Sequence, residues 1–186
     1  MTKRKRKHHK IAVATVSSVV AISSVPVTTA FGNEHDLIDL KTANSHTDNI
    51  IELLKRGVVS GYEDRTYRPN EHITRAQAAK IIANILELDL QNISDPKFSD
   101  IPTSHSYYSY IAALAEANII HGDAGQYKPN DFITRGQMSK IISRAFELEE
   151  ENEMKASPFS DVSPTNQYAK YVQTLVKHNI TTGKED

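Results

Sequence analysis

The chain has 186 residues, carries 22 basic against 23 acidic side chains for a formal net charge of −1, and contains no cysteine. The absence of cysteine excludes disulfide bonds and a thiol nucleophile, so the fold has to be stabilised by core burial. The charge balance gives no general electrostatic attraction for nucleic acid or anionic lipid, because acidic side chains outnumber basic ones beyond the first thirty residues.

The first thirty residues are predicted to be a signal peptide. Six basic side chains precede residue 11, an uncharged stretch covers 11–25, and small residues suited to signal peptidase occupy 28–30. The uncharged stretch is too short and too rich in Ser and Thr for a membrane span. A basic nucleic-acid-binding tail is the less favoured alternative, because the apolar run follows directly. Removing the six basic residues from the 22 leaves 16 against 23 acidic ones, a net charge of −7.

An apolar-x-Asp-apolar motif opens three units of the chain. It reads LIDL at 37–40, FSDI at 98–101 and FSDV at 159–162, and each copy starts 61 residues after the previous one. Each copy is followed by apolar residues at helical spacing, which predicts a short helix in each unit. Gly57, Asn118 and Asn179 then predict the helix ends, because Gly and Asn accept the left-handed conformation of a C-terminal cap.

A Pro-Asn turn and a longer helix complete the first two units. Residues 67–77 read YRPNEHITRAQ and residues 127–137 read YKPNDFITRGQ. In each copy Thr is followed three residues later by Gln, which predicts a capping box. The Thr hydroxyl accepts the third helical N–H, and the Gln side chain accepts the N–H of the cap residue. Apolar helices are predicted at 78–88 and 138–148.

These signals predict a signal peptide (1–30), two complete units (37–92 and 98–152) and a partial third unit (159–186). Repeats of this length indicate one helical supersecondary unit per repeat. The predicted fold is mostly α, with a short helix, a loop and a capped longer helix in each unit. The third unit lacks the Pro-Asn turn and the second helix. The sequence leaves open a truncated product or a last helix supplied from elsewhere.

The ordered motifs resemble the S-layer homology (SLH) module. The resemblance rests on FSDI and FSDV, the Gly-Tyr and Gly-Asp loops, the Tyr-x-Pro-Asn turns and ITRAQ, and it covers roughly residues 37–186. It implies a secreted Gram-positive protein of the cell wall or S-layer, whose repeats form a pseudo-threefold helical bundle. It also implies non-covalent binding to the pyruvylated secondary polysaccharide attached to peptidoglycan.

Arg75 and Arg135 are the sharpest candidates for ligand binding. Each would be the first residue of a helix, where a cation costs about 0.3–1 kcal/mol unless an anion lies nearby. Free N–H groups at the same helix end favour an anion, and a guanidinium suits a carboxylate. The pyruvyl ketal implied by the resemblance would supply that carboxylate. The alternative is an ion pair within the fold, with Glu71, Asp131 or an Asp of the opening motif.

Nine further residues at repeated positions are predicted to contact the polysaccharide. They are Thr74, Thr134, Gln77, Gln137, Gly61, Gly122, Asp39, Asp100 and Asp161. Each has a structural alternative: Thr and Gln as capping groups, Asp as the residue that orders a turn, and Gly as a backbone requirement. For the Asp residues, and likewise for the Thr, Gln and Gly residues, the structural alternative is favoured.

No catalytic site, metal site or cofactor is predicted. The sequence contains no HExxH, Gly-x-Ser-x-Gly or Gly-rich phosphate motif, and the histidines beyond residue 30 lack metal-ligand spacing. The sequence therefore favours a wall-anchoring module over an enzyme. Two alternatives stay open: an assembly protein that pairs with other SLH chains, and a truncated remnant of a longer S-layer protein or anchored enzyme.

Overall fold

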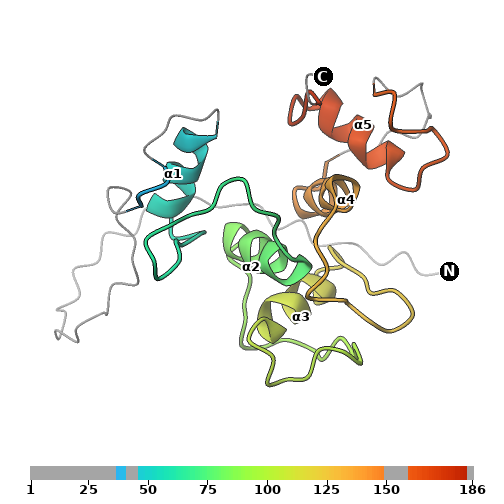
Figure 1. Cartoon of the computed structure of the whole chain (residues 1–186). Coiled ribbons are helices and arrows are strands. Elements are labelled where there is room, and N and C mark those ends of the chain that lie inside the picture. The colour runs from blue at the N-terminus through green and yellow to red at the C-terminus, as the bar shows by residue number, and fades with distance from the viewer. Residues whose placement is uncertain (1–36, 41–45, 149–158, 184–186) are drawn as a thin grey trace, which may run out of the picture. The chain divides into compact units, whose positions relative to one another are not determined.

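The computed structural model describes residues 37–40, 46–148 and 159–183, and within them it contains five α-helices (Figure 1). They are α1 (Thr47–Lys55), α2 (Arg75–Ile85), α3 (Tyr108–Glu116), α4 (Arg135–Ala145) and α5 (Ala169–Lys177). The described ranges contain no strand, only isolated bridges. The prediction of a mostly α-helical fold is confirmed. The predicted signal peptide lies outside the described residues, and the pseudo-threefold relation stays a prediction.

Residues Phe31–Asp186 form one compact unit by themselves. In the part of the chain that is described, no helix combines the length and the apolar character needed to cross a bilayer. Nor do three or more His, Asp or Glu side chains gather there in a way that could hold a metal ion.

Both predicted capping boxes are confirmed, at the starts of α2 and α4. The hydroxyl of Thr74 accepts the Gln77 N–H at 3.2 Å, and the Gln77 side chain accepts the Thr74 N–H at 2.8 Å. The same pair of bonds joins Thr134 and Gln137, at 3.2 and 3.0 Å. The caps start both helices at the Arg of the motif, three residues before the predicted apolar stretches begin.

Each of the three short helices ends as predicted, with the left-handed residue at Gly57 (φ 66°), Asn118 (φ 59°) and Asn179 (φ 56°). In each case the N–H of the next residue closes the helix by bonding to the carbonyl five residues back, which is the Schellman motif. The predicted C-terminal caps are therefore confirmed.

The two longer helices end at Ile85 and Ala145, three residues before the predicted boundaries. Glu87 (φ 51°) and Glu147 (φ 50°) take the left-handed position there, although neither is a residue that favours it. The N–H of Leu88 bonds to the Ala83 carbonyl at 3.1 Å and completes a Schellman motif in α2. The predicted ends were wrong because Leu88 and Leu148, which follow the left-handed residue, stand at helical spacing from the last apolar residues of the helix and so look like part of it in the sequence.

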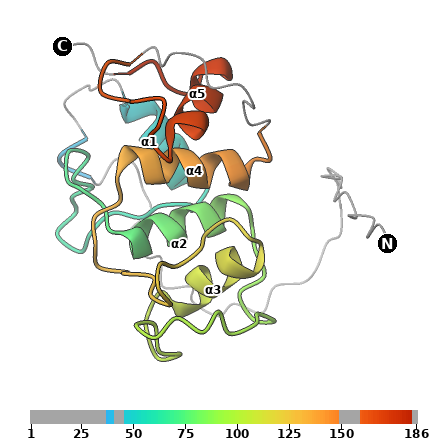
Figure 2. The ribbon, with the colours of Figure 1, turned by 90° about the vertical axis from the view of Figure 1, so that its right-hand side faces the viewer.

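Two apolar clusters lie within the described residues. The larger one joins α2, α3, their loops and Ile141 of α4, and its most buried side chains are Ala79, Ile111, Leu114 and Tyr127, all 1% exposed or less. The smaller one contains Leu37, Leu40, Ile50 and Leu54. Figure 2 shows α2 alongside α3 and α5 against α4, in agreement with their contacts.

The Pro-Asn turn of the second unit (127–133, turn 2) lies against the start of α2. The first two helical N–H groups donate to it: Arg75 to the Asp131 carbonyl at 2.9 Å and Ala76 to the Pro129 carbonyl at 3.0 Å. In return, the Ile133 N–H donates to the Ile73 carbonyl at 3.1 Å. This contact joins the first unit to the second and places α2 beside the site described next.

Candidate functional site

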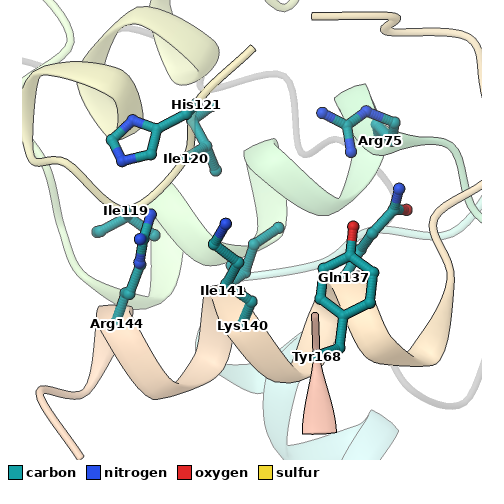
Figure 3. Close-up of a pocket in the computed structure, with 9 residues that line it drawn as sticks. All are labelled: Arg75, Ile119, Ile120, His121, Gln137, Lys140, Ile141, Arg144 and Tyr168. Carbon is teal, nitrogen blue, oxygen red and sulfur yellow. The ribbon is translucent and has the colours of Figure 1, made fainter. Parts of the chain in front are cut away.

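A pocket opens between the start of α2, the end of α3, and the face of α4 (Figure 3). It is lined by Arg75, Ile119, Ile120, His121, Gln137, Lys140, Ile141, Arg144 and Tyr168. Three of these, Gln137, Lys140 and Arg144, follow one face of α4 at intervals of three and four residues. Figure 3 shows the nitrogen atoms of Arg75, Lys140 and Arg144 directed toward the same space.

The pocket carries basic groups and no carboxylate among its lining residues. Burial lowers the pKa of His121, and the charges of Arg144 and Lys140 lower it further. Protonation of the imidazole is therefore disfavoured by the positive charges beside it, and the lining residues supply no carboxylate to balance those charges. Such a pocket favours a ligand that brings its own negative charge.

Among the residues that line the pocket, Arg144 has a buried polar atom that is not hydrogen-bonded within the described residues. This atom is Nη1 of its guanidinium. A buried charged donor without an acceptor costs free energy, and almost all buried polar groups in folded proteins are bonded. An anionic ligand oxygen at this place would remove that cost.

Arg75 reaches the pocket from the first position of α2. Its Nε donates to the Tyr127 carbonyl at 2.8 Å, and its guanidinium lies 4.6 Å from the centre of the Tyr127 ring. The Tyr127 hydroxyl donates back to the Arg75 carbonyl at 2.9 Å. Burial raises the pKa of Tyr127 to about 12, although the charge of Arg75 acts in the opposite direction. These bonds orient Arg75 by main-chain contacts, so that its guanidinium faces the pocket.

Gln137 and Tyr168 complete one end of the pocket. The carboxamide oxygen of Gln137 is used by the Thr134 cap, which leaves its nitrogen for a ligand. Tyr168 is the N-cap residue of α5, and its ring lies against Gly136, where a Cβ would come within 2.9 Å of it. Glycine at this position therefore lets an aromatic ring approach the start of α4.

A second pocket shares Ile120 and His121 with the first. Its lining includes Asp95, Glu116 and Gly122, so its character is acidic where the first pocket is basic. The two pockets meet at His121. Together they suit an extended ligand with an anionic group at one end and donors such as hydroxyls at the other.

The aspartates of the first two opening motifs bind the Pro-Asn turns. Asp39 accepts the N–H groups of Tyr67 and Arg68 at 2.8 and 2.7 Å. Asp100 accepts those of Tyr127 and Lys128 at the same two distances. Burial alone would raise the pKa of Asp100, but these amides and the charge of Arg75 outweigh it and lower the pKa.

Glycine is required beside the opening motifs because of close approach. A Cβ at Gly122 would come within 2.5 Å of the Gln126 carbonyl and 2.6 Å of the Phe98 ring. At Gly61 the Leu37 side chain and the Thr66 carbonyl occupy the corresponding space. Both glycines therefore let the loop close over the first residue of the opening motif.

The pocket brings together two of the residues predicted from sequence, Arg75 and Gln137, and the second pocket adds Gly122. The other eight line neither pocket: Arg135, Thr74, Thr134, Gln77, Gly61, Asp39, Asp100 and Asp161. As polysaccharide contacts all eleven stay predictions. Sequence reasoning did not assign His121, Lys140, Arg144 or Tyr168 to the site. The helical spacing of 137, 140 and 144 is the signal that could have found this face of α4.

The chain matches a family model described as the S-layer homology domain over residues 40–79, 97–139 and 158–186, and the last match is shorter. It is 32% identical to the surface-layer 125 kDa protein of Lysinibacillus sphaericus, over all of this chain and 15% of that protein. It is 27% identical to the S-layer protein sap of Bacillus anthracis, over 96% of this chain and 22% of that protein. Its similarity to an amylopullulanase of Thermoanaerobacterium thermosulfurigenes, at 37% identity, covers 77% of this chain and 8% of that enzyme. The chain thus spans less than a quarter of each of these relatives.

Proposed function

This chain belongs to the S-layer homology family, and from that membership we propose that it anchors non-covalently to the Gram-positive cell wall by binding an anionic wall polysaccharide. A location at the cell surface is supported by the S-layer proteins among its relatives. The proposed binding site is the pocket of Arg75, Lys140 and Arg144. The proposed ligand is the secondary polysaccharide attached to peptidoglycan.

The observation that carries this proposal is the buried, unpartnered Nη1 of Arg144 in a pocket with basic groups and no carboxylate. A carboxylate accepts hydrogen bonds from a guanidinium in a fork, and charge-assisted bonds of this kind are stronger than neutral ones. A pyruvyl ketal on a sugar ring would present such a carboxylate. The acidic second pocket would then accept hydroxyl groups of the neighbouring sugar.

The test is co-sedimentation of residues 31–186 with native cell walls and with walls stripped of their secondary polysaccharide by acid. Walls that retain the polymer but lack its pyruvyl groups provide the third arm. The proposal expects pelleting with native walls only. Pelleting with all three would place the ligand in peptidoglycan instead, and pelleting with the first and third would exclude the ketal.

Binding is expected to strengthen as the pH falls through and below the ordinary pKa of histidine, about 6.5. In the free protein, burial and the charges of Arg144 and Lys140 hold the pKa of His121 below its ordinary value. A bound carboxylate would offset those charges and raise the pKa, so binding takes up a proton and lower pH favours the complex. Affinity is measured by calorimetry across this range of pH.

The matched variants are His121→Asn, which should remove most of the pH dependence, and His105→Gln, which should keep it. His105 is half-buried, stands three residues before α3 begins and lines neither pocket. An unchanged pH profile in His121→Asn would exclude His121 from the site.

A second candidate function is assembly with other SLH chains. One observation favours it: the start of α4 has no turn bonded to it in the described residues, whereas the start of α2 has turn 2. This difference leads to the inference below.

A further inference from the structure

The two Pro-Asn turns and the two capped helices differ in the hydrogen bonds that they make to one another. Turn 2 is bonded to the start of α2 through three backbone hydrogen bonds. The corresponding groups of α4, which are the Arg135 and Gly136 N–H groups and the Ile133 carbonyl, have no partner among the described residues. The same holds for the carbonyls of Pro69 and Glu71 and the N–H of Ile73 in turn 1 (67–73). Within the described residues, one helix start and one turn are therefore vacant.

The exposure of equivalent residues follows the same difference. Tyr127 and Pro129 of turn 2 are buried, whereas Tyr67 and Pro69 of turn 1 are half-buried. Arg75 at the start of α2 is half-buried, whereas Arg135 at the start of α4 is exposed. Turn 1 and the start of α4 are thus exposed to solvent in the way expected of turn 2 and the start of α2 if the contact between those two were absent.

Arg135 also lacks the partners that Arg75 has. Arg75 donates to the carbonyl of a turn tyrosine and lies over its ring. For Arg135, no hydrogen bond, ion pair or ring contact of its side chain is found in the described part of the chain, and the nearest turn tyrosine, Tyr127, is taken by Arg75. The turn tyrosine that no helix start of the described residues contacts through such bonds is Tyr67, which stands in turn 1 where Tyr127 stands in turn 2.

We propose that turn 1 of a second copy of this chain docks on the start of α4, in the geometry that turn 2 has on α2. The Arg135 N–H would donate to the Glu71 carbonyl, and the Gly136 N–H to the Pro69 carbonyl. The Ile73 N–H would donate to the Ile133 carbonyl. The Tyr67 ring would lie beneath the Arg135 guanidinium.

The occupant is a second copy because the same polypeptide carries both complementary surfaces. The residue types agree at each position: Tyr, Pro, an acidic residue and Ile in the turns, and Ile-Thr-Arg before the helices. The contact joins two different surfaces, so it is a head-to-tail contact that can add further copies. It does not depend on polysaccharide binding, because neither Arg135 nor turn 1 lines the proposed pocket.

The test is the solution mass of residues 31–186 by light scattering at concentrations up to about 1 mM, where a contact with a dissociation constant of that size is populated. The wild-type mass should rise with concentration beyond that of one chain. The key variant is Arg135→Pro, which deletes both the N–H and the guanidinium. Proline suits the first helical position, and Thr134 already has the extended conformation that proline requires before it (φ −85°, ψ 158°).

Arg135→Pro should stay at the mass of one chain at every concentration, while Arg56→Gln, an exposed arginine at the end of α1, should behave as wild type. Tyr67→Ala, which damages turn 1, should also fail to associate. An equimolar mixture of Arg135→Pro and Tyr67→Ala should form pairs and nothing larger, because each variant retains one intact surface. Circular dichroism verifies that both variants are folded.

A wild-type chain that stays monomeric at about 1 mM would overturn the proposal. So would association of Arg135→Pro at the wild-type level, or the absence of pairs in the mixture of two folded variants. A mass rise only after addition of a different SLH protein would overturn the second copy as the occupant. Loss of wall binding in the co-sedimentation test would leave all of these readouts unchanged, so the two proposals fail separately.

Discussion

Replacing Tyr127 by alanine is expected to lower the free energy of unfolding by about 3–5 kcal/mol, the loss typical of a buried aromatic side chain. Tyr127 is 1% exposed, and its ring packs against Phe98 with centroids 5.7 Å apart. The truncation also removes the platform of the Arg75 guanidinium and the hydroxyl bond to the Arg75 carbonyl. Because small domains are stable by about 5–15 kcal/mol in total, the variant should unfold at a much lower urea concentration.

The repeat supplies a matched control for this prediction. Tyr67 occupies the same position in turn 1, where it is half-buried and no helix start of the described residues is bonded to the turn. Tyr67→Ala is expected to cost about 1–2 kcal/mol, since less apolar surface is lost. Tyr127→Phe isolates the hydroxyl and should cost about 1 kcal/mol. Equal losses for the two alanine variants, measured by urea unfolding and circular dichroism, would contradict the role assigned to the contact between the units.

Replacing Arg144 by glutamine is expected to weaken binding of the anionic wall polysaccharide about 10- to 150-fold, which corresponds to the loss of one charge-assisted hydrogen bond. The same change should leave the stability of the free protein unchanged or raise it. The reason is that Arg144 Nη1 is buried without a partner in the described residues, so its removal relieves a desolvation cost. Opposite effects on binding and stability are the signature of a residue kept for a ligand.

Affinity is measured by calorimetry with isolated polysaccharide, and stability by thermal unfolding. The control is Arg56→Gln, the same chemical change at an exposed arginine outside both pockets. Wild-type affinity in Arg144→Gln would remove this arginine from the site. A large loss of stability would show instead that its guanidinium has a structural role.

Features that depend on neighbours in sequence could be predicted from the sequence. The capping boxes need only a Thr and a Gln three residues apart, and the left-handed caps at Gly57 and Asn118 need only the residue type. The glutamates that end α2 and α4 could not be predicted, because glutamate does not favour the left-handed conformation that they take. In α2, Leu88 follows this residue and packs against the larger apolar cluster, a tertiary contact that local sequence does not reveal.

The pocket could be predicted only in part, because it depends on which segments meet in space. Arg75 and Arg135 stand in nearly identical motifs, yet turn 2 covers one and nothing in the described residues covers the other. Arg144 belongs to no repeated motif, since Asn84 stands at the equivalent place in α2. The repeat therefore predicts the features common to the units, such as the capping boxes, whereas the pocket also depends on residues that differ between the units, such as Arg144.

The carboxylates that bind the turns have a consequence for how the chain folds. Asp39 reaches the Tyr67 amide across 28 residues, and Asp100 reaches the Tyr127 amide across 27. Each of these two units is thus closed by a contact within that unit, and contacts of short sequence separation form faster than distant ones. The turn of each unit can therefore be tied to its opening motif early in folding, whereas the larger core also needs α2 of the first unit and α3 of the second to meet. Without disulfides to form, no slow oxidation step delays folding.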